Sequence, residues 1–349
     1  MLFSIGLITG VFLISIMPFP SKSIKIFTIA FFLFFISICR SFYFTTDAIY
    51  YVEKYELLRY KSLNSFWTEL ISDNGKDPFF YFSSKIISDL GFSARAWLAL
   101  ISFFFLLAIS YLIHSYSKKV FFSFFIFITL GYFYFSLTGL RQTIAISIFI
   151  LAILKILDRK NIQAIFLIVL ASMFHSSALV TLLIFIIKNI KNKIIIFSFL
   201  SSSFIFSLFY GDKIKSLLQN TIDNISVQDS IYRSTTLSYT GFLIQLSIYL
   251  FCLILLNKKK NIDNKINILL NISLLGVMFS MFSPVVAEFF RISLYFNMIN
   301  IVLIPIAIQE ITNQKLKYLL TLIIMIFLFI YFVDSAEFFD YQFYWEVGR

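Results

Sequence analysis

One charged residue, Arg141, stands inside the long apolar run from residue 120 to residue 154, and Gln142 follows it directly. A transmembrane helix needs about 20 apolar residues, so this run is long enough for two crossings. An arginine at the centre of a bilayer costs roughly 2.5–3.5 kcal/mol, and one that is kept there usually has a function. Its guanidinium is a rigid fork of donors that suits phosphate. The chemistry open to Arg141 therefore depends on whether it lies at mid-membrane or at a turn.

Two further side chains could transfer a proton. His175, in "ASMFHSSALV", is flanked by two serines, although a lone histidine is often only a hydrogen-bonded structural residue. Asp47, in "YFTTDAIYYVEKY", follows an apolar run closely, so its carboxylate could face the mouth of a helical bundle as a general base. Asp47 could equally be the N-cap of the helix that follows, and the two roles are compatible.

The composition indicates a polytopic membrane protein. The chain has 349 residues, of which 60% are hydrophobic and 13% are charged, whereas soluble domains are nearer 45–50% apolar and 25% charged. Residues 1–19 lack a basic region and a cleavage site, so a first span is a better interpretation than a signal peptide. The sequence has neither a Walker loop nor a GxGxxG motif, and both cysteines fall in apolar runs. We therefore expect no cofactor and no metal.

The basic residues define the expected topology. Short loops rich in lysine belong in the cytoplasm by the positive-inside rule, so the net charge of +11 reflects topology and does not indicate nucleic acid as a partner. These loops contain Lys22/Lys25, Lys118/Lys119, Lys155/Arg159/Lys160, Lys188/Lys191/Lys193, Lys258/Lys259/Lys260/Lys265 and Lys315/Lys317. The loops before residue 120 and after residue 157 then share one side, which places Arg141 at an outer turn between two spans.

Two loops on the same side of the membrane must be joined by an even number of crossings. With every lysine-rich loop in the cytoplasm, this rule predicts an all-α membrane bundle of about twelve spans, with both termini outside. The spans are roughly 1–19, 24–44, 96–114, 120–138, 142–157, 160–175, 176–190, 194–209, 241–256, 266–283, 292–309 and 317–333. The spans 160–175 and 176–190 are each shorter than the hydrocarbon core of a bilayer. Either the connection between them at His175 is recessed below the outer surface, or the segment is a single span. We expect one transmembrane domain over 1–349, with external loops at about 45–95 and 210–240. In the first loop, Asp77 as N-cap, Pro78 and Gly91 predict a helix with a stripe of Phe79, Phe82, Ile86 and Leu90. Such a helix would lie on the outer membrane surface or cap the bundle.

On this topology, seven of the eight arginines are external. Arg40, Arg141 and Arg291 lie at span ends beside apolar sequence, which favours an external site for a phosphate-bearing lipid. The alternatives are snorkelling and a helical ion pair between Glu288 and Arg291.

Four short motifs carry a resemblance to a known family. They are Arg-x6-Asp-x3-Tyr (Arg40, Asp47, Tyr51), Gly-Leu-Arg-Gln-x2-Ala from Gly139, Phe-His-x-Ser-Ala-Leu from Phe174, and Arg-x3-Tyr-Phe from Arg291. In this order the chain resembles bacterial O-antigen polymerases of the Wzy type and the related EpsG-like polysaccharide polymerases. A glycine that such proteins often carry just before the aspartate of the first loop is absent here, where Thr45 and Thr46 precede Asp47.

The resemblance implies a GT-C-like glycosyltransferase of the bacterial inner membrane. It would join oligosaccharide repeat units linked to undecaprenyl pyrophosphate on the periplasmic face, for O-antigen, capsule or exopolysaccharide, without a nucleotide sugar. Membrane lipid and a chain-length regulator protein are the further partners that it suggests. The pyrophosphate site would consist of Arg40, Arg141, Gln142, Arg291 and Tyr295. For the general base we rank Asp47 first, His175 second and Glu288 third.

Two other functions fit the same chain. A flippase for lipid-linked oligosaccharides would also have about twelve spans, but we would expect charges deep in several of them rather than at outer span ends. An O-antigen ligase shares the chemistry and differs in its acceptor.

Overall fold

The computed structural model describes residues 2–72, 77–190, 239–257, 263–284, 286, 288–336 and 341–346, with isolated residues between 198 and 213. The regular structure of the described residues is helical, with one isolated β-bridge between Arg40 and Phe343. Close contacts divide the chain into unit 1 (Met1–Leu179 and Ile311–Arg349) and unit 2 (Val180–Glu310), which are described separately. The single domain expected from the sequence stays a prediction.

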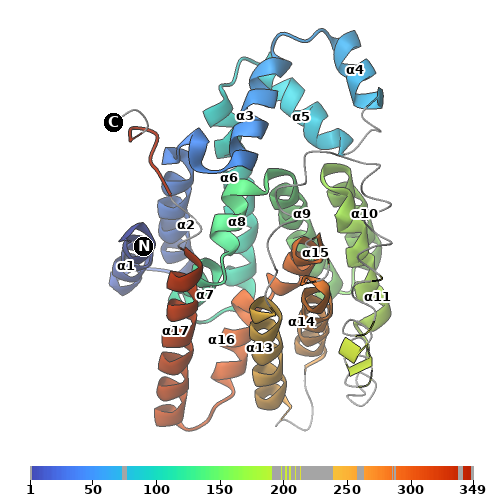
Figure 1. The fold of residues 1–349 in the computed structure, drawn as a ribbon. Coiled ribbons are helices and arrows are strands. Elements are labelled where there is room, and N and C mark those ends of the chain that lie inside the picture. Colours follow the sequence, from blue (N-terminus) through green and yellow to red (C-terminus); the bar gives the residue numbers. More distant parts are fainter. Residues whose placement is uncertain are drawn as a thin grey trace. The chain divides into compact units, whose positions relative to one another are not determined.

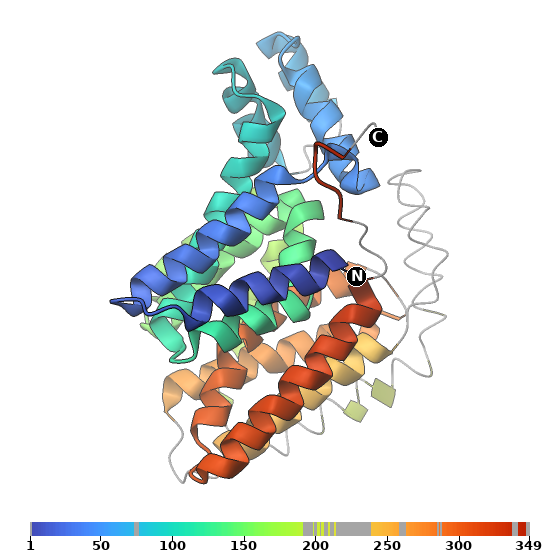
Figure 2. The same ribbon diagram turned by 90° about the vertical axis from the view of Figure 1, so that its left-hand side faces the viewer.

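Unit 1 holds most of the helices. They are α1 (Leu2–Ile16), α2 (Lys22–Cys39), η1 (Phe42–Phe44), α3 (Thr46–Leu58), α4 (Leu63–Ser72), α5 (Pro78–Asp89), α6 (Ala94–Tyr116), α7 (Val120–Thr129), α8 (Tyr132–Thr138), α9 (Leu140–Leu157), α10 (Asn161–Phe174) and α17 (Gln314–Ala336). Figure 1 shows α3, α4 and α5 gathered at one end of α2, α6, α9 and α10. Helix α1 lies along α2 and α7 (Figure 2).

Five helices are long and apolar enough to cross a membrane, namely α2, α6, α9, α14 (Asn264–Phe282) and α17. The count rises to seven if two bent pairs are each one span: α7 with α8, bent by 54°, and α15 (Glu288–Asn297) with α16 (Asn300–Gln309), bent by 45°. The expected spans 1–19, 160–175, 176–190 and 241–256 correspond to shorter apolar helices, and most of 194–209 lies outside the described residues. The structure therefore confirms an α-helical membrane protein but not the number of about twelve spans.

The two ends of the helix pair α2 and α6 carry different basic residues, as expected from the predicted topology. At one end, the Lys22 ammonium donates to the carbonyl of His114 at 2.6 Å, which joins the start of α2 to the end of α6. At the other end, Arg95 at the start of α6 donates to the carbonyl of Ile38 at 2.6 Å. Lysine loops and arginines thus lie at opposite ends of this helix pair.

Large apolar side chains are exposed along whole faces of α2, α6 and α17. Phe27, Phe31 and Phe35 line α2, and Leu319, Ile323 and Ile326 are among those that line α17. Apolar surface of this extent is typical of contact with lipid tails, so these faces indicate where the bilayer lies.

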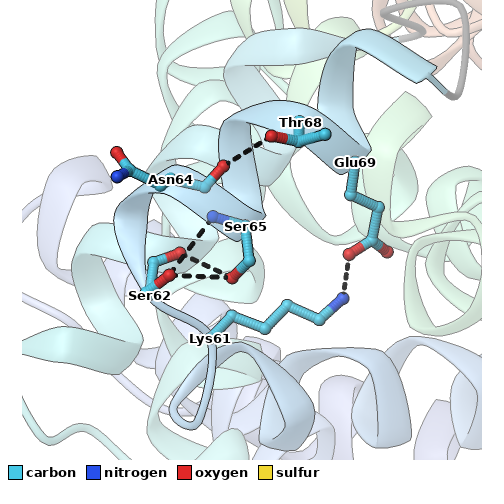
Figure 3. A network of polar contacts seen from close by, with 6 residues as sticks. All are labelled: Lys61, Ser62, Asn64, Ser65, Thr68 and Glu69. Atoms are coloured by element: carbon cyan, nitrogen blue, oxygen red, sulfur yellow. Dashed lines mark hydrogen bonds and ion pairs between the residues drawn. The ribbon is translucent and has the colours of Figure 1, made fainter.

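The first external segment, expected at about 45–95, folds into α3, α4 and α5 around its own core. The rings of Tyr55 and Trp97 stack with centroids 4.6 Å apart, and the Tyr55 hydroxyl donates to the carbonyl of Phe92 at 2.9 Å. Figure 3 shows how α4 begins: the Ser62 hydroxyl accepts from the amide of Ser65, and Lys61 forms an ion pair with Glu69. The second expected external loop, 210–240, lies almost wholly outside the described residues.

Helix α5 begins at Pro78, and Gly91 has the positive φ of 84° expected after a helix end. The predicted apolar stripe lies largely on the exposed side of the helix, as a helix on the membrane surface would have it. Phe79, Ile86 and Leu90 are exposed, whereas the buried face includes Lys85, whose ammonium forms an ion pair with Asp89. The apolar stripe is therefore free to meet lipid.

Unit 2 contains α11 (Ile184–Ile187), α13 (Thr240–Leu256), α14, α15 and α16. Helices α14 and α15 approach so closely at Gly276 that an added Cβ would lie 1.9 Å from Oδ1 of Asn297. A buried polar chain links three helices: Ser273 donates to Asn300, and Asn300 donates to Gln245, each at 2.9 Å.

Candidate functional site

Four segments of unit 1 meet at one polar cluster. They contribute Tyr51 from α3, Asp77 from the residue before α5, Arg141 from the first turn of α9, and His175 with Ser176 from the break after α10. We call these five residues the Asp77 cluster. The chain does break at His175, as one of the two expectations for this segment required, and the helix boundary at Gly139–Leu140 confirms that Arg141 begins a helix. The sequence separations are as large as 99 residues, so tertiary structure alone assembles the cluster.

Asp77 occupies the N-cap position of α5 as predicted, but it does not act as a cap. Its backbone has φ 52° and ψ 50°, in the left-handed region, and its side chain makes no capping hydrogen bond. Aspartate tolerates this conformation better than most residues. The carboxylate is thereby free to bond with groups from other helices.

The Asp77 carboxylate accepts three hydrogen bonds from three groups. Oδ2 accepts from Nη1 of Arg141 at 2.7 Å and lies 3.3 Å from Nδ1 of His175, while Oδ1 accepts from the backbone amide of Ser176 at 2.9 Å. Only 3% of the Asp77 side chain is exposed, against 25% for Arg141 and 17% for His175. The carboxylate therefore lies beneath its two partners, which both remain open to solvent or substrate.

Electrostatics keep this carboxylate ionised. Burial by itself would raise the pKa of Asp77, but the hydrogen bond and charge of His175, the Arg141 guanidinium and the Ser176 amide together hold the pKa below its ordinary value. An ionised carboxylate can only accept, so the proton between the two side chains belongs to Nδ1 of His175. Nε2 of His175 is then an acceptor in the neutral ring, which is the atom a general base requires.

Tyr51 fixes the other edge of Arg141. Its hydroxyl accepts from Nε of Arg141 at 2.8 Å, and the guanidinium carbon lies 5.5 Å from the centre of the tyrosine ring. Burial raises the pKa of Tyr51, and the negative charge of Asp47 adds to this effect. With Nε and Nη1 both held, the guanidinium has a fixed orientation, and within the described residues its Nη2 carries no bond.

Asp47 lies one turn before Tyr51 in α3, so the two share a helix face. It is not the N-cap, because the Thr45 hydroxyl accepts from the amide of Ala48 at 3.2 Å and takes that role. Asp47 is half-buried in the first turn, where a negative charge is favourable. The structure thus places it beside the Asp77 cluster, next to Tyr51.

The remaining predicted residues of unit 1 lie elsewhere. Gln142 is buried, and it points about 100° around α9 from Arg141, as neighbouring helical residues do. Arg40 is buried against the C-terminal segment of the chain, and among the described residues it forms no hydrogen bond with the Asp77 cluster.

Glu288, Arg291 and Tyr295 all belong to α15 in unit 2. Glu288 is exposed, Arg291 is half-buried and Tyr295 is fully buried in its own unit. Their proposed roles stay predictions.

The sequence did not single out three members of the cluster. Asp77 was interpreted only as a cap, because an Asp-Pro pair before an apolar segment has that local meaning. Tyr51 appeared in the resemblance and, with neighbouring tyrosines, as a residue of an aromatic belt or a sugar-stacking surface, not as a partner of Arg141. Ser176 contributes a backbone amide, which no residue type reveals. Nothing near Asp77 in the sequence indicates that its carboxylate bonds to Arg141 and His175, and only the folded chain reveals these partners.

The cluster can bind an anion and accept a proton at adjacent positions. A preorganised guanidinium stabilises negative charge that develops on a leaving group, and the imidazole beside it can take a proton. Among the described residues, no group of three or more His, Cys, Asp or Glu could hold a metal ion.

No curated protein sequence and no solved structure matches the chain. A family model does match, the one described as the EpsG family, and it covers residues 24–343. This range includes every residue of the Asp77 cluster and nearly the whole described chain. The chain belongs to the EpsG family.

Proposed function

We propose that this protein is a membrane glycosyltransferase that polymerises oligosaccharide repeat units carried on a lipid pyrophosphate, at the external face of the bacterial inner membrane. Membership of the EpsG family supports a polysaccharide polymerase. The observation that carries the proposal is the Arg141 guanidinium, which is held on two edges by Asp77 and Tyr51, with Nδ1 of His175 3.3 Å from the same carboxylate.

Arg141 binds the pyrophosphate of the donor in this mechanism. Because Nε and Nη1 are already oriented, the exposed part of the fork meets the phosphate oxygens without a loss of side-chain freedom. As the anomeric C–O bond breaks, the bonding electron pair passes to the pyrophosphate, and the guanidinium stabilises the added charge.

His175 receives the proton of the acceptor hydroxyl. Nδ1 donates to Asp77, so Nε2 is available as the acceptor, and the hydroxyl oxygen forms the new glycosidic bond as its proton moves to Nε2. Asp77 is a positioning residue that orients both His175 and Arg141. This arrangement moves His175 ahead of Asp47 as the proposed base, with Asp47 second because it lies one turn from Tyr51.

The finer architecture belongs to the same proposal. About twelve spans in a GT-C-like arrangement would use the long apolar helices, the bent pairs and the shorter apolar helices together. The end of unit 1 that carries Arg40, Arg95 and Arg141 would face the periplasm, by the positive-inside rule.

Arg141→Lys tests the proposal. Lysine keeps the charge but cannot hold Asp77, Tyr51 and a phosphate with one fixed fork, so polymerisation should fall roughly 10- to 100-fold, the value of about one charge-assisted hydrogen bond. Glycolipid ladder gels from a deletion strain complemented at matched expression give the readout. Arg59→Lys is the control, since Arg59 is an exposed arginine whose guanidinium donates to the carbonyl of Gly91.

The pattern on the gel separates the rival functions. Loss of a polymerase leaves single repeat units on the surface glycolipid, loss of a flippase leaves none, and loss of a ligase leaves polymer on the lipid carrier. Full-length ladders from the Lys variant at wild-type amounts would refute the role of Arg141.

A further inference from the structure

Arg40 is a buried charge that lacks a hydrogen-bond partner within the described residues. Only 1% of the residue is exposed, and none of Nε, Nη1 and Nη2 bonds with another atom there. A guanidinium has five N–H donors, and leaving them unpaired away from water is strongly unfavourable. Such a group calls for an anion, and none of the described residues supplies one.

The C-terminal segment, residues 341–346, closes over this guanidinium. The amide of Ser41 donates to the carbonyl of Gln342 at 2.8 Å, and the amide of Tyr344 donates to the carbonyl of Cys39 at 3.0 Å. The Tyr341 hydroxyl donates to the carbonyl of Ile36 at 2.6 Å. These bonds and the stacking of the Tyr341 ring on Phe3, with centroids 3.8 Å apart, help to hold the segment. The segment belongs to no helix, so it can leave and return without unfolding one.

A second guanidinium adds to the positive charge. Nη1 of Arg95 donates to the carbonyls of Ile38 and Arg40, at 2.6 and 3.2 Å. Its guanidinium carbon lies 4.7 Å from the Phe42 ring and 4.4 Å from the Tyr344 ring. The nearest acidic group of the segment, Glu346, accepts from the amide of Phe343 instead.

Arg40 is nevertheless charged at neutral pH. Burial lowers its pKa to about 10, the Tyr341 hydroxyl acts in the opposite direction, and Arg95 lowers it further. Two guanidinium groups therefore share this end of α2, and no carboxylate pairs with either of them among the described residues.

We propose that Arg40 is a binding site for a phosphate-bearing anion, separate from the Asp77 cluster, which the C-terminal segment covers and admits by moving aside. Arginine recognises phosphate in two-point fashion, which would satisfy the donors that the protein leaves unpaired. The exposed apolar face of α2 with Phe31 and Phe35 leads to this position, so a lipid could place its headgroup phosphate there. A free pyrophosphate offers the same chemistry. The inference stands whether or not the chain is a polymerase, because it concerns binding alone.

The test uses the full chain, delipidated in a maltoside detergent that contains no phosphate, and measures the midpoint of thermal unfolding. Inorganic pyrophosphate is added in one arm and phosphatidylglycerol in another, with sodium chloride at matched ionic strength. We expect at least one of them to raise the midpoint saturably by about 2 °C or more. Stabilisation by pyrophosphate points to a free or isoprenoid pyrophosphate, and stabilisation by phosphatidylglycerol alone points to a lipid headgroup.

Arg40→Met removes the buried charge and should abolish this stabilisation while leaving the ligand-free midpoint no lower than that of the wild type. Arg40→Lys keeps the positive charge but lacks the planar fork of guanidinium donors, so the anion should stabilise this variant less than the wild type. Arg59→Met, at an exposed arginine, should respond to the anion as the wild type does. Equal stabilisation of the Met variant, or no stabilisation of the wild type by either anion, overturns the proposal.

Cys39 reports on the segment directly, because the amide of Tyr344 bonds to its carbonyl. In a Cys252→Ser background, Cys39 is the sole thiol of the chain. The anion relieves the unpaired charge and so favours closure, which should slow the reaction of Cys39 with a water-soluble maleimide. Arg40→Met should slow it without any anion. Both expectations follow if the unpaired charge of Arg40 favours opening of the segment. Faster reaction of Cys39 in the Met variant would contradict this.

Discussion

Asp77→Asn is the sharpest test of the Asp77 cluster. The substitution keeps the shape of the side chain and the oxygen that accepts from the Ser176 amide at 2.9 Å. It removes the negative charge that pairs with Arg141 at 2.7 Å and orients Nδ1 of His175 at 3.3 Å. Loss of the ion pair should lower the stability of the variant, and loss of the orientation of His175 and Arg141 should lower its catalytic activity.

The magnitude follows from the burial of the two partners. Removing one member of a fully buried ion pair costs about 3–5 kcal/mol, whereas an exposed pair is worth about 0–1 kcal/mol. The Asp77 side chain is 3% exposed and that of Arg141 is 25% exposed. We therefore expect a loss of about 2 kcal/mol, between these limits. Loss of an oriented base and guanidinium should reduce polymerisation by at least about 100-fold.

The assay combines ladder gels with thermal unfolding of the purified protein. Glu69→Gln is the control, because its carboxylate is 43% exposed and its partner Lys61 is 26% exposed. The double variant Asp77→Asn with Arg141→Gln removes both charges, so it should recover much of the stability lost in Asp77→Asn and remain inactive. Wild-type ladders from Asp77→Asn would refute the reasoning.

The lowered pKa of Asp77 also sets a pH dependence. A depressed pKa in the folded protein gives stability that is fully present above the unfolded value, about 3.9, and is lost as the pH falls through the folded value. The difference in midpoint between the wild type and Asp77→Asn should therefore shrink below about pH 4. A constant difference between pH 7 and pH 3 would show that the carboxylate is not stabilised in this way.

Three other outcomes are expected. His175→Asn keeps an amide near the position of Nδ1 but cannot accept the proton, so polymerisation should fall about 10²- to 10⁴-fold while the amount of protein in the membrane stays near normal. If His175→Asn were active and Asp47→Asn inactive, the general base would be Asp47. Gly276→Ala should destabilise unit 2 by about 1–3 kcal/mol because its Cβ meets Asn297, whereas Gly241→Ala, which has open space around it, should not. Cysteine at exposed Tyr60 should label from outside intact spheroplasts and cysteine at Lys160 should not. Labelling of Lys160→Cys would overturn the topology.

Local patterns determined much of this protein correctly. Composition and apolar runs indicated an α-helical membrane protein, and lysine loops separated the two ends of the pair α2 and α6. The Pro78 and Gly91 signals located α5, and the run around Arg141 was correctly divided at a turn. These features depend on neighbours within a few residues or on the bilayer, which acts on every span alike. The motif order also identified the family correctly.

Local patterns did not reveal the partners of individual side chains. The apolar stripe of α5 was correctly located, but its position did not decide between a helix on the membrane surface and a cap on the bundle, and the buried face includes Lys85 with its own ion-pair partner. Asp77 has a short-range meaning as a cap, which its left-handed backbone prevents. Its actual partners, Arg141 and His175, are 64 and 98 residues away. Only tertiary structure decided this pairing, because a buried carboxylate is stable only where packing brings donors to it, and such long-range packing leaves no periodic signal in the sequence.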